Sequence, residues 1–134
     1  MKIKNSTDYP VHFLRRMTAW CAKHVGYKPS LLRSVEFRNR TTAAYSGHAY
    51  GTRRIVVSIG PPSMFPTTPD RRPGMAMEVF ADRLEGLLAV TAHEIAHLLQ
   101  YKTGRIHRLG RERRTERDAR WHEVAALRAF REQR

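Results

Sequence analysis

The sequence is short of cysteine, of long apolar runs and of acidic residues. Cys21 is the single cysteine among 134 residues, which excludes an intramolecular disulfide and a cysteine-rich metal cluster. No stretch approaches the roughly 20 apolar residues of a transmembrane helix, and residues 1–8 lack the apolar run of a secretory signal. We therefore expect one soluble, cytoplasmic domain over residues 1–134, which is long enough to bury a core without disulfides.

Basic residues outnumber acidic residues two to one. Twelve Asp and Glu stand against 25 Lys and Arg, so the formal net charge is +13 at pH 7. Such a charge attracts polyanions, and a surface that binds DNA or RNA is one explanation of it. A solvated basic surface without a partner is the other, because charge alone defines no site.

Hydrophobic periodicity predicts an N-terminal helix followed by a small sheet. Apolar residues recur at three- and four-residue spacing over 10–25, and Gly26 is placed to end that helix. Short segments rich in β-branched and aromatic residues follow at 35–37, 42–50 and 54–59. We expect these segments to form three short antiparallel strands.

A proline-rich segment separates the predicted sheet from two further helices. Residues 60–74 contain five prolines and should form a loop, either a rim or lid of a functional site or a disordered excursion. The helical period returns over 82–103 with apolar residues on nearly every side, which predicts a buried helix. A basic connector at 105–114 leads to a last helix over 115–133. The expected fold class is α+β.

The buried helix carries the pattern His93-Glu94-Ile95-Ala96-His97, an H-E-x-x-H motif. Histidines at i and i+4 lie one above the other on a helix, so both imidazoles can bind one metal ion. Zn²⁺ with an open coordination position is the cofactor that this pattern predicts. Glu94, beside that position, is the expected general base that takes a proton from zinc-activated water. The alternative is a pair of core histidines that hydrogen-bond to backbone or water.

A catalytic zinc ion needs a third protein ligand, and three residues after the motif are candidates. Glu116 is favoured because a small alanine one turn later lets the last helix approach closely. His107 lies in the connector, and His122 lies farther along the last helix at a different angle. The predicted ligands are therefore His93, His97 and Glu116, with His107 and His122 as open alternatives.

The order of a helix, a sheet, an H-E-x-x-H helix and a ligand helix resembles the minimal fold of zincin metalloproteases. SprT-like domains, which include proteases that act on proteins cross-linked to DNA, are similar to this chain in three places. These are Gly-His-Ala at 47–49, Arg-Ile-Val-Val-Ser at 54–58, and the segment 98–105 that continues the motif helix. Such domains usually take a third histidine in a His-Gly context, whereas this chain has Leu109-Gly110.

ImmA/IrrE-like peptidases are similar in the last helix. Their ligand helix carries a Glu-x-x-Ala pattern, which Glu116 and Ala119 match. His122 and Glu123 stand where that family tends to have Phe-Ala. Glu123 is either a group that supports a ligand or a solvated glutamate.

These resemblances imply a zinc metalloendopeptidase with a protein or peptide substrate, including proteins associated with DNA. In zincins the strand before the active helix often pairs with an extended peptide, which would make 54–59 the docking edge unless that strand is internal. The alternative function is a basic nucleic-acid-binding module with a structural or inactive zinc site. It depends on the net charge and on the arginines in and after the connector: Arg105, Arg108, Arg111, Arg113, Arg114, Arg117 and Arg120. Open candidates for stabilising the oxyanion are Tyr50, Tyr101, His107 and His122.

Overall fold

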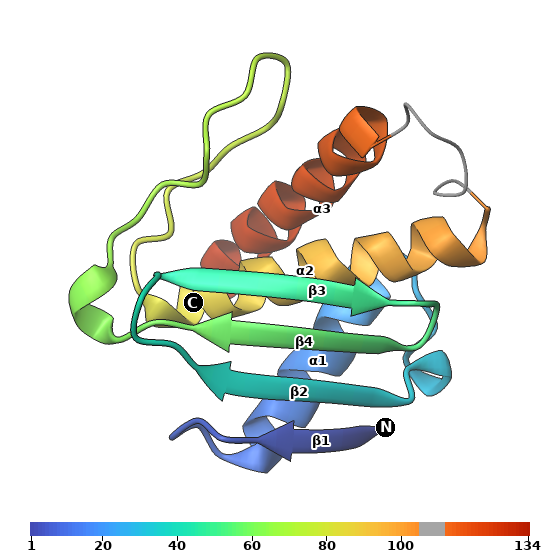
Figure 1. Ribbon diagram of the computed structural model, residues 1–134, viewed down its shortest axis with the longest axis horizontal. Coiled ribbons are helices and arrows are strands. Elements are labelled where there is room, and N and C mark those ends of the chain that lie inside the picture. The colour runs from blue at the N-terminus through green and yellow to red at the C-terminus, as the bar shows by residue number, and fades with distance from the viewer. Residues whose placement is uncertain (105–111) are drawn as a thin grey trace.

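The computed structural model describes residues 1–104 and 112–134 (Figure 1). Within these residues the elements are β1 (Lys2–Asn5), α1 (Val11–Val25), β2 (Ser34–Asn39), β3 (Tyr45–Tyr50), β4 (Arg54–Ile59), α2 (Arg83–Lys102) and α3 (Glu112–Gln133). Short 3-10 turns occupy Pro29–Leu31 and Pro62–Met64. The α+β class expected from the sequence is confirmed.

The sheet has four strands and is mixed, so the expectation of three antiparallel strands is wrong. The strand order is β1-β2-β4-β3, in which β1 pairs parallel with β2, β2 pairs parallel with β4, and β4 pairs antiparallel with β3. β1 escapes sequence analysis because its four residues contain a single apolar side chain, Ile3. Its parallel pairing with β2 is made through α1, as in a βαβ unit.

β4 is an internal strand, which corrects the expectation that 54–59 is a docking edge. Its Ile-Val-Val run at 55–57 is buried throughout, as is usual for a strand flanked by neighbours in a parallel sheet. The edge next to α2 is β3, whose sequence contains serine, glycine and histidine and is only partly buried.

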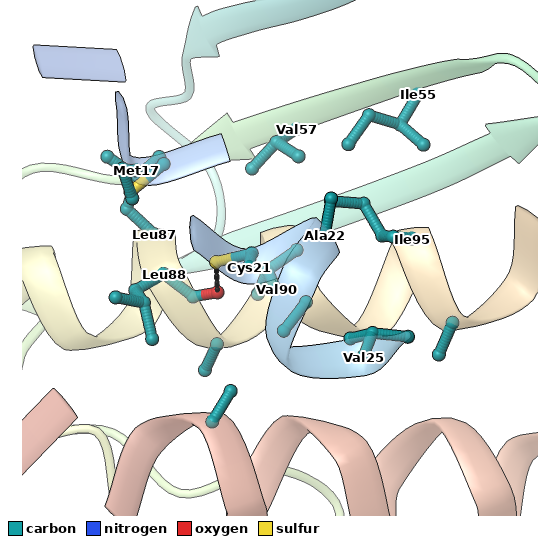
Figure 2. Close-up of a cluster of buried hydrophobic side chains, with 14 of the residues drawn as sticks. Met17, Cys21, Ala22, Val25, Ile55, Val57, Leu87, Leu88, Val90 and Ile95 are labelled. Atoms are coloured by element: carbon teal, nitrogen blue, oxygen red, sulfur yellow. Dashed lines mark hydrogen bonds between the residues drawn. The ribbon is translucent and has the colours of Figure 1, made fainter. Parts of the chain in front are cut away.

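The helices lie on one face of the sheet, with α3 packed mainly against α2 (Figure 1). Figure 2 shows side chains of α1, α2 and β4 meeting in the core between them. In this core the Cys21 thiol donates to the carbonyl oxygen of Leu88 at 3.6 Å, and burial raises the pKa of the thiol. A buried neutral thiol of this kind is a packing group rather than a nucleophile.

The connection from β4 to α2 ends in a helix cap at the start of α2. The Asp82 carboxylate accepts from the Glu85 backbone N–H, and the Glu85 carboxylate accepts from the Ala81 N–H, both at 2.9 Å. This reciprocal pair of bonds, which resembles a capping box, fixes where α2 begins. Across the described residues, no helix combines the length and the apolarity that a membrane crossing needs.

Candidate metal centre

Three side chains from α2 and α3 bring one ligand atom each to a common point. His93 Nε2 lies 2.9 Å from Glu116 Oε1, His97 Nε2 lies 2.8 Å from the same oxygen, and the two Nε2 atoms are 3.2 Å apart. The two histidines meet because they are one turn apart on α2, and Glu116 reaches them because α3 packs closely on α2 through the fully buried Ala119. Among the described residues this is the group of His, Cys, Asp and Glu side chains that could hold a metal ion.

Hydrogen bonds on the far side of each ring determine which nitrogen faces this point. His93 Nδ1 lies 3.0 Å from the Glu123 carboxylate, and His97 Nδ1 lies 2.8 Å from the Gln100 side-chain oxygen. The Gln100 amide nitrogen donates to Thr115 O and to Asp118 Oδ2, so its oxygen is the atom left for His97. Both Nδ1 atoms therefore donate to these acceptors, and both Nε2 atoms face the common point, where a lone pair on each can bind a metal ion.

Two imidazole lone pairs and a carboxylate oxygen thus converge within about 3 Å of one another. A single proton shared among three acceptors would satisfy one of these contacts and leave the others repulsive. A cation in the middle would satisfy all three. Two imidazole nitrogens and one carboxylate oxygen are also the donor set of many catalytic zinc sites, in which the fourth position stays open. The residues present fit Zn²⁺.

The pKa values of His93 and Glu116 also show that this cluster favours positive charge. Burial acts to lower the pKa of His93, but the hydrogen bonds with Glu116 and Glu123 outweigh it and raise the pKa to about 10. Burial acts to raise the pKa of Glu116, but the hydrogen bonds with His93 and His97 outweigh it and hold that pKa well below its usual range. The cluster therefore favours a cation over neutral partners.

Glu94 lies beside this cluster in a cleft of about 540 Å³ between α2, α3 and β3. Its side chain is 7% exposed, and burial raises the pKa of its carboxyl group. Gly47 on β3 leaves the room that this carboxylate occupies, since a Cβ at position 47 would lie 2.6 Å from Glu94 Oε2. The cleft thus keeps a nearly dry carboxylate next to three metal-ligand atoms.

The proline-rich loop forms one wall of the cleft, at Pro69 and Asp70. Arg120, which is 7% exposed and lies one turn after Glu116 on α3, donates to the backbone carbonyl oxygen of Asp70. The loop is therefore a rim of the site, one of the two outcomes expected from its sequence. Arg120 stood among the basic residues in the sequence, and nothing in its spacing pointed to this contact.

Of the three candidates for a third ligand, the structure brings Glu116 to the two histidines. His107 lies outside the described residues. His122 Nε2 lies 3.8 Å from Asp118 Oδ1, and the centre of its ring lies 5.1 Å from that of Trp121. His122 does not belong to the three-residue cluster. Glu123 is 4% exposed and bonded to His93, so it supports a ligand and is not a solvated glutamate. Of the oxyanion candidates in the described structure, Tyr101 lines the cleft.

Comparisons of the chain with protein-family models, with curated proteins and with solved structures gave no match. The argument for function therefore depends on the site itself.

Proposed function

We propose that the protein is a zinc-dependent metallopeptidase of the zincin kind. The observation that carries this proposal is the convergence of His93 Nε2, His97 Nε2 and Glu116 Oε1 beside the buried carboxylate of Glu94. His93, His97 and Glu116 would hold the ion. When bound, zinc supplies a Lewis acid that polarises the scissile carbonyl group and lowers the pKa of water.

Glu94 is the general base. Its carboxylate takes a proton from the attacking water and delivers that proton to the leaving amine, so one group serves both halves of the hydrolysis. Its burial in the cleft keeps bulk water from hydrating the carboxylate and from competing for the proton. The absence of a side chain at Gly47 leaves the room that this carboxylate needs to lie in the cleft.

Glu123 and Gln100 position the two histidines. Each accepts the Nδ1 proton of its histidine, which keeps the ring in the tautomer whose Nε2 can bind a metal. Gln100 is in turn held by Thr115 and Asp118 of α3, so the orientation of His97 depends on the packing of the two helices.

The substrate of this proposal is an extended peptide segment that pairs with β3. β3 is the edge strand of the described sheet that lies next to α2, and residues 45–49 line the cleft. Backbone groups on a free strand edge can bind a peptide of varied sequence, because main-chain hydrogen bonds do not depend on side chains. This geometry brings a peptide bond of the substrate past Glu94.

Elemental mass spectrometry and a cleavage assay on an unfolded protein substrate test the proposal. We expect about one zinc ion per chain, as in other catalytic sites with three protein ligands. Glu94→Gln should retain the zinc and the fold and lose about 10²- to 10⁴-fold in cleavage rate, which is the usual contribution of a general base. Glu132→Gln, an exposed change on α3, is the control. Undiminished cleavage by Glu94→Gln, or no zinc after reconstitution, would contradict the proposal.

A further inference from the structure

The face of the sheet that carries no helix is basic. α1 and α2 pack on the opposite face, and no described helix crosses the side of the strands that faces the viewer in Figure 1. Val35 and Phe37 of β2 and Ile55 and Val57 of β4 point into the core, and the strand register extends these inner positions to β1 and β3. The residues that alternate with them along each strand lie on the face without helices. Four exposed cations occupy these outer positions: Lys2, Lys4, Arg38 and Arg54.

One carboxylate lies among these cations and is already neutralised. The four strands contain a single acidic residue, Glu36, which is 9% exposed. It is ion-paired with Arg38 and lies 4.0 Å from the Lys4 ammonium group. The hydrogen bond from Arg38 lowers its pKa, so the pair persists near neutral pH. The four outer cations of the strands therefore stand against one carboxylate, which leaves a net positive charge on this face.

Aromatic side chains lie on the same face. Tyr50 is directly opposite Arg54 in the antiparallel pair, with the guanidinium carbon 4.9 Å from the centre of the ring. The His48 ring, two residues back on β3, lies 5.9 Å from the Tyr50 ring. Tyr50 is 48% exposed, so part of its ring remains open to solvent beside the Arg54 guanidinium. The two side chains offer a guanidinium plane and a phenol ring for stacking.

We propose that this outer face binds single-stranded nucleic acid. Phosphates would meet the lysines and arginines, and bases would stack on Tyr50 and on the guanidinium plane of Arg54. A single strand is favoured over a duplex because its base faces are exposed, whereas a duplex hides them inside its stack. From β1 to β3 the face spans three strand spacings, about 14 Å, which accommodates a short oligonucleotide.

The face is separate from the metal centre, although both use β3. Gly47 of β3 faces Glu94 in the cleft, and His48 also lines the cleft, whereas Tyr50 and Arg54 of the outer face do not. The inference does not rest on the peptidase proposal, so nucleic-acid binding should be the same in Glu94→Gln as in the unchanged chain.

Fluorescence anisotropy with a labelled single strand of about 12 nucleotides, within the range of site sizes for one small domain, tests the inference. Tyr50→Ala should lower the affinity about fivefold or more, because it removes a stacked base. The double variant Lys2→Gln/Arg54→Gln should reduce the slope of log affinity against log salt by about 1.4, or about 0.7 for each lost phosphate contact.

A charge-matched control separates this face from general attraction. Arg16 and Lys23 are exposed on α1, on the other side of the molecule, and Arg16→Gln/Lys23→Gln removes the same charge. We expect this control to keep its affinity and salt slope within twofold of the unchanged chain, with thermal unfolding checking the fold of each variant.

Several results would overturn the inference. Equal losses in the two double variants would show attraction to net charge without a binding face. An unchanged affinity in Tyr50→Ala, or tighter binding of the matching duplex, would show that bases do not stack there. Polyglutamate could displace the labelled strand as well as an unlabelled oligonucleotide does at the same concentration of negative charge, which would identify an acidic protein as the partner. If the labelled strand does not bind even at low salt, the face is a solvated basic surface without a nucleic-acid partner.

Discussion

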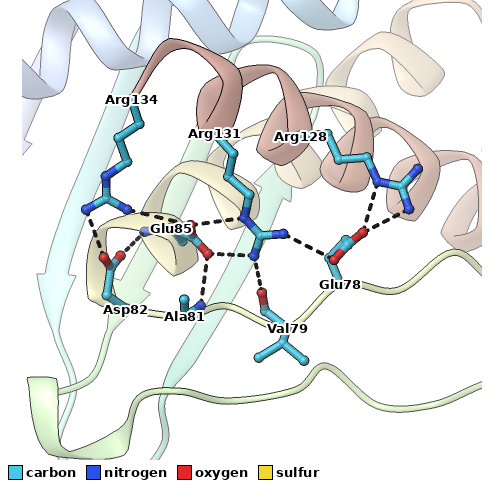
Figure 3. Close-up of polar contacts among 8 residues, drawn as sticks. All are labelled: Glu78, Val79, Ala81, Asp82, Glu85, Arg128, Arg131 and Arg134. Carbon is cyan, nitrogen blue, oxygen red and sulfur yellow. Dashed lines mark hydrogen bonds and ion pairs between the residues drawn. The ribbon is translucent and has the colours of Figure 1, made fainter.

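α2 and α3 meet at two polar clusters whose charges are arranged differently. Near the N-terminal end of α2, three acidic side chains lie against three arginines at the C-terminal end of α3 and directly after it (Figure 3): Glu78 with Arg128, Glu85 with Arg131, and Asp82 with Arg134. Between two and three turns farther along α2, three glutamates lie with two histidines: Glu94, Glu116 and Glu123 with His93 and His97. No described lysine or arginine is ion-paired with any of these three glutamates.

The first cluster, which we call the arginine clamp, is complete as it stands. Arg131 donates to Glu78, to Glu85 and to the backbone carbonyl oxygen of Val79, so the segment before α2 is held to the last turns of α3. The candidate metal centre differs by the same criterion, because its glutamates face histidines and no described lysine or arginine. Opposite charges in the clamp hold two helices together, whereas the second cluster has the donor set that the proposal assigns to a metal ion. The comparison predicts that stability depends on zinc at one end of α2 and on arginine at the other.

The largest expected effect is stabilisation by zinc. An ion that binds only the folded state at 1,000 times its dissociation constant adds about 4 kcal/mol to the free energy of unfolding. We expect this increase in urea unfolding when zinc is added after chelation, and its loss in Glu116→Ala. Glu132→Ala, an exposed change on the same helix, should keep it. An equal response to zinc in both variants would show that Glu116 is not a ligand.

The second effect is the loss of the clamp. Arg131→Met leaves Glu85, whose side chain is 5% exposed, without its main counter-charge. Removing one partner of a buried ion pair usually costs about 3 kcal/mol, since the remaining charge stays buried. Urea unfolding measures this cost, and zinc content should not change. Arg128→Met is the matched control: Arg128 is 66% exposed, and an exposed ion pair contributes about 0.5 kcal/mol. Equal costs in the two variants would contradict the contrast between buried and exposed pairs.

The third effect concerns Glu94, the proposed general base. Gly47→Ala places a Cβ 2.6 Å from Glu94 Oε2, which is too close for atoms that are not bonded, so the proposed general base must move. We expect about 100-fold slower peptide cleavage, equivalent to about 2.7 kcal/mol in the activation barrier, with zinc content retained. Ser58→Ala on the neighbouring strand is the control. Zinc loss in Gly47→Ala would instead indicate that the whole centre is distorted.

Local patterns in the sequence were sufficient to predict three helices, of which α3 begins three residues earlier than expected, and the residues of the candidate site. α1 and α2 begin and end within one residue of the predicted bounds, because their apolar spacing and their terminal Pro10, Asp82 and Gly26 act over a few residues. His93 and His97 face the same way for an equally local reason, their spacing of four on a helix. Glu116 could be favoured because a small residue, Ala119, follows it one turn later on the same predicted helix.

What the sequence could not predict depends on contacts between distant segments. Strand order is one case, because β2 and β4 pair in parallel although β3 lies between them in the chain. The residues of a single strand do not indicate which strand lies at the edge of the sheet. The partners of the histidines are another. Glu123 and Gln100 look like ordinary polar residues, and only the packing of α3 on α2 brings Glu123 to His93 and fixes the amide of Gln100.

The smallest expected effect is the response of the arginine clamp to acid. The hydrogen bond from Arg131 holds the pKa of Glu85 below its ordinary value of 4.5, and one from Arg128 does the same for Glu78. The unfolded chain therefore binds protons at a higher pH than the folded chain. The stabilisation is fully present above about pH 4.5 and is lost as the pH falls through the lowered values.

Glu85→Gln isolates this contribution. Asp82, Arg131 and Arg134 also face Glu85, and they remain in the variant. The free energy of unfolding in urea is measured for the unchanged chain and for Glu85→Gln, both without metal. The metal centre titrates in the same way in both proteins, so it cancels in the difference, which then reports the titration of the clamp. We expect the difference to be constant from neutral pH to about pH 5 and to shrink below it. A difference that stays constant into the acid range would show that Arg131 holds Glu85 by geometry alone, and the contrast between the two ends of α2 would then depend on packing and not on charge.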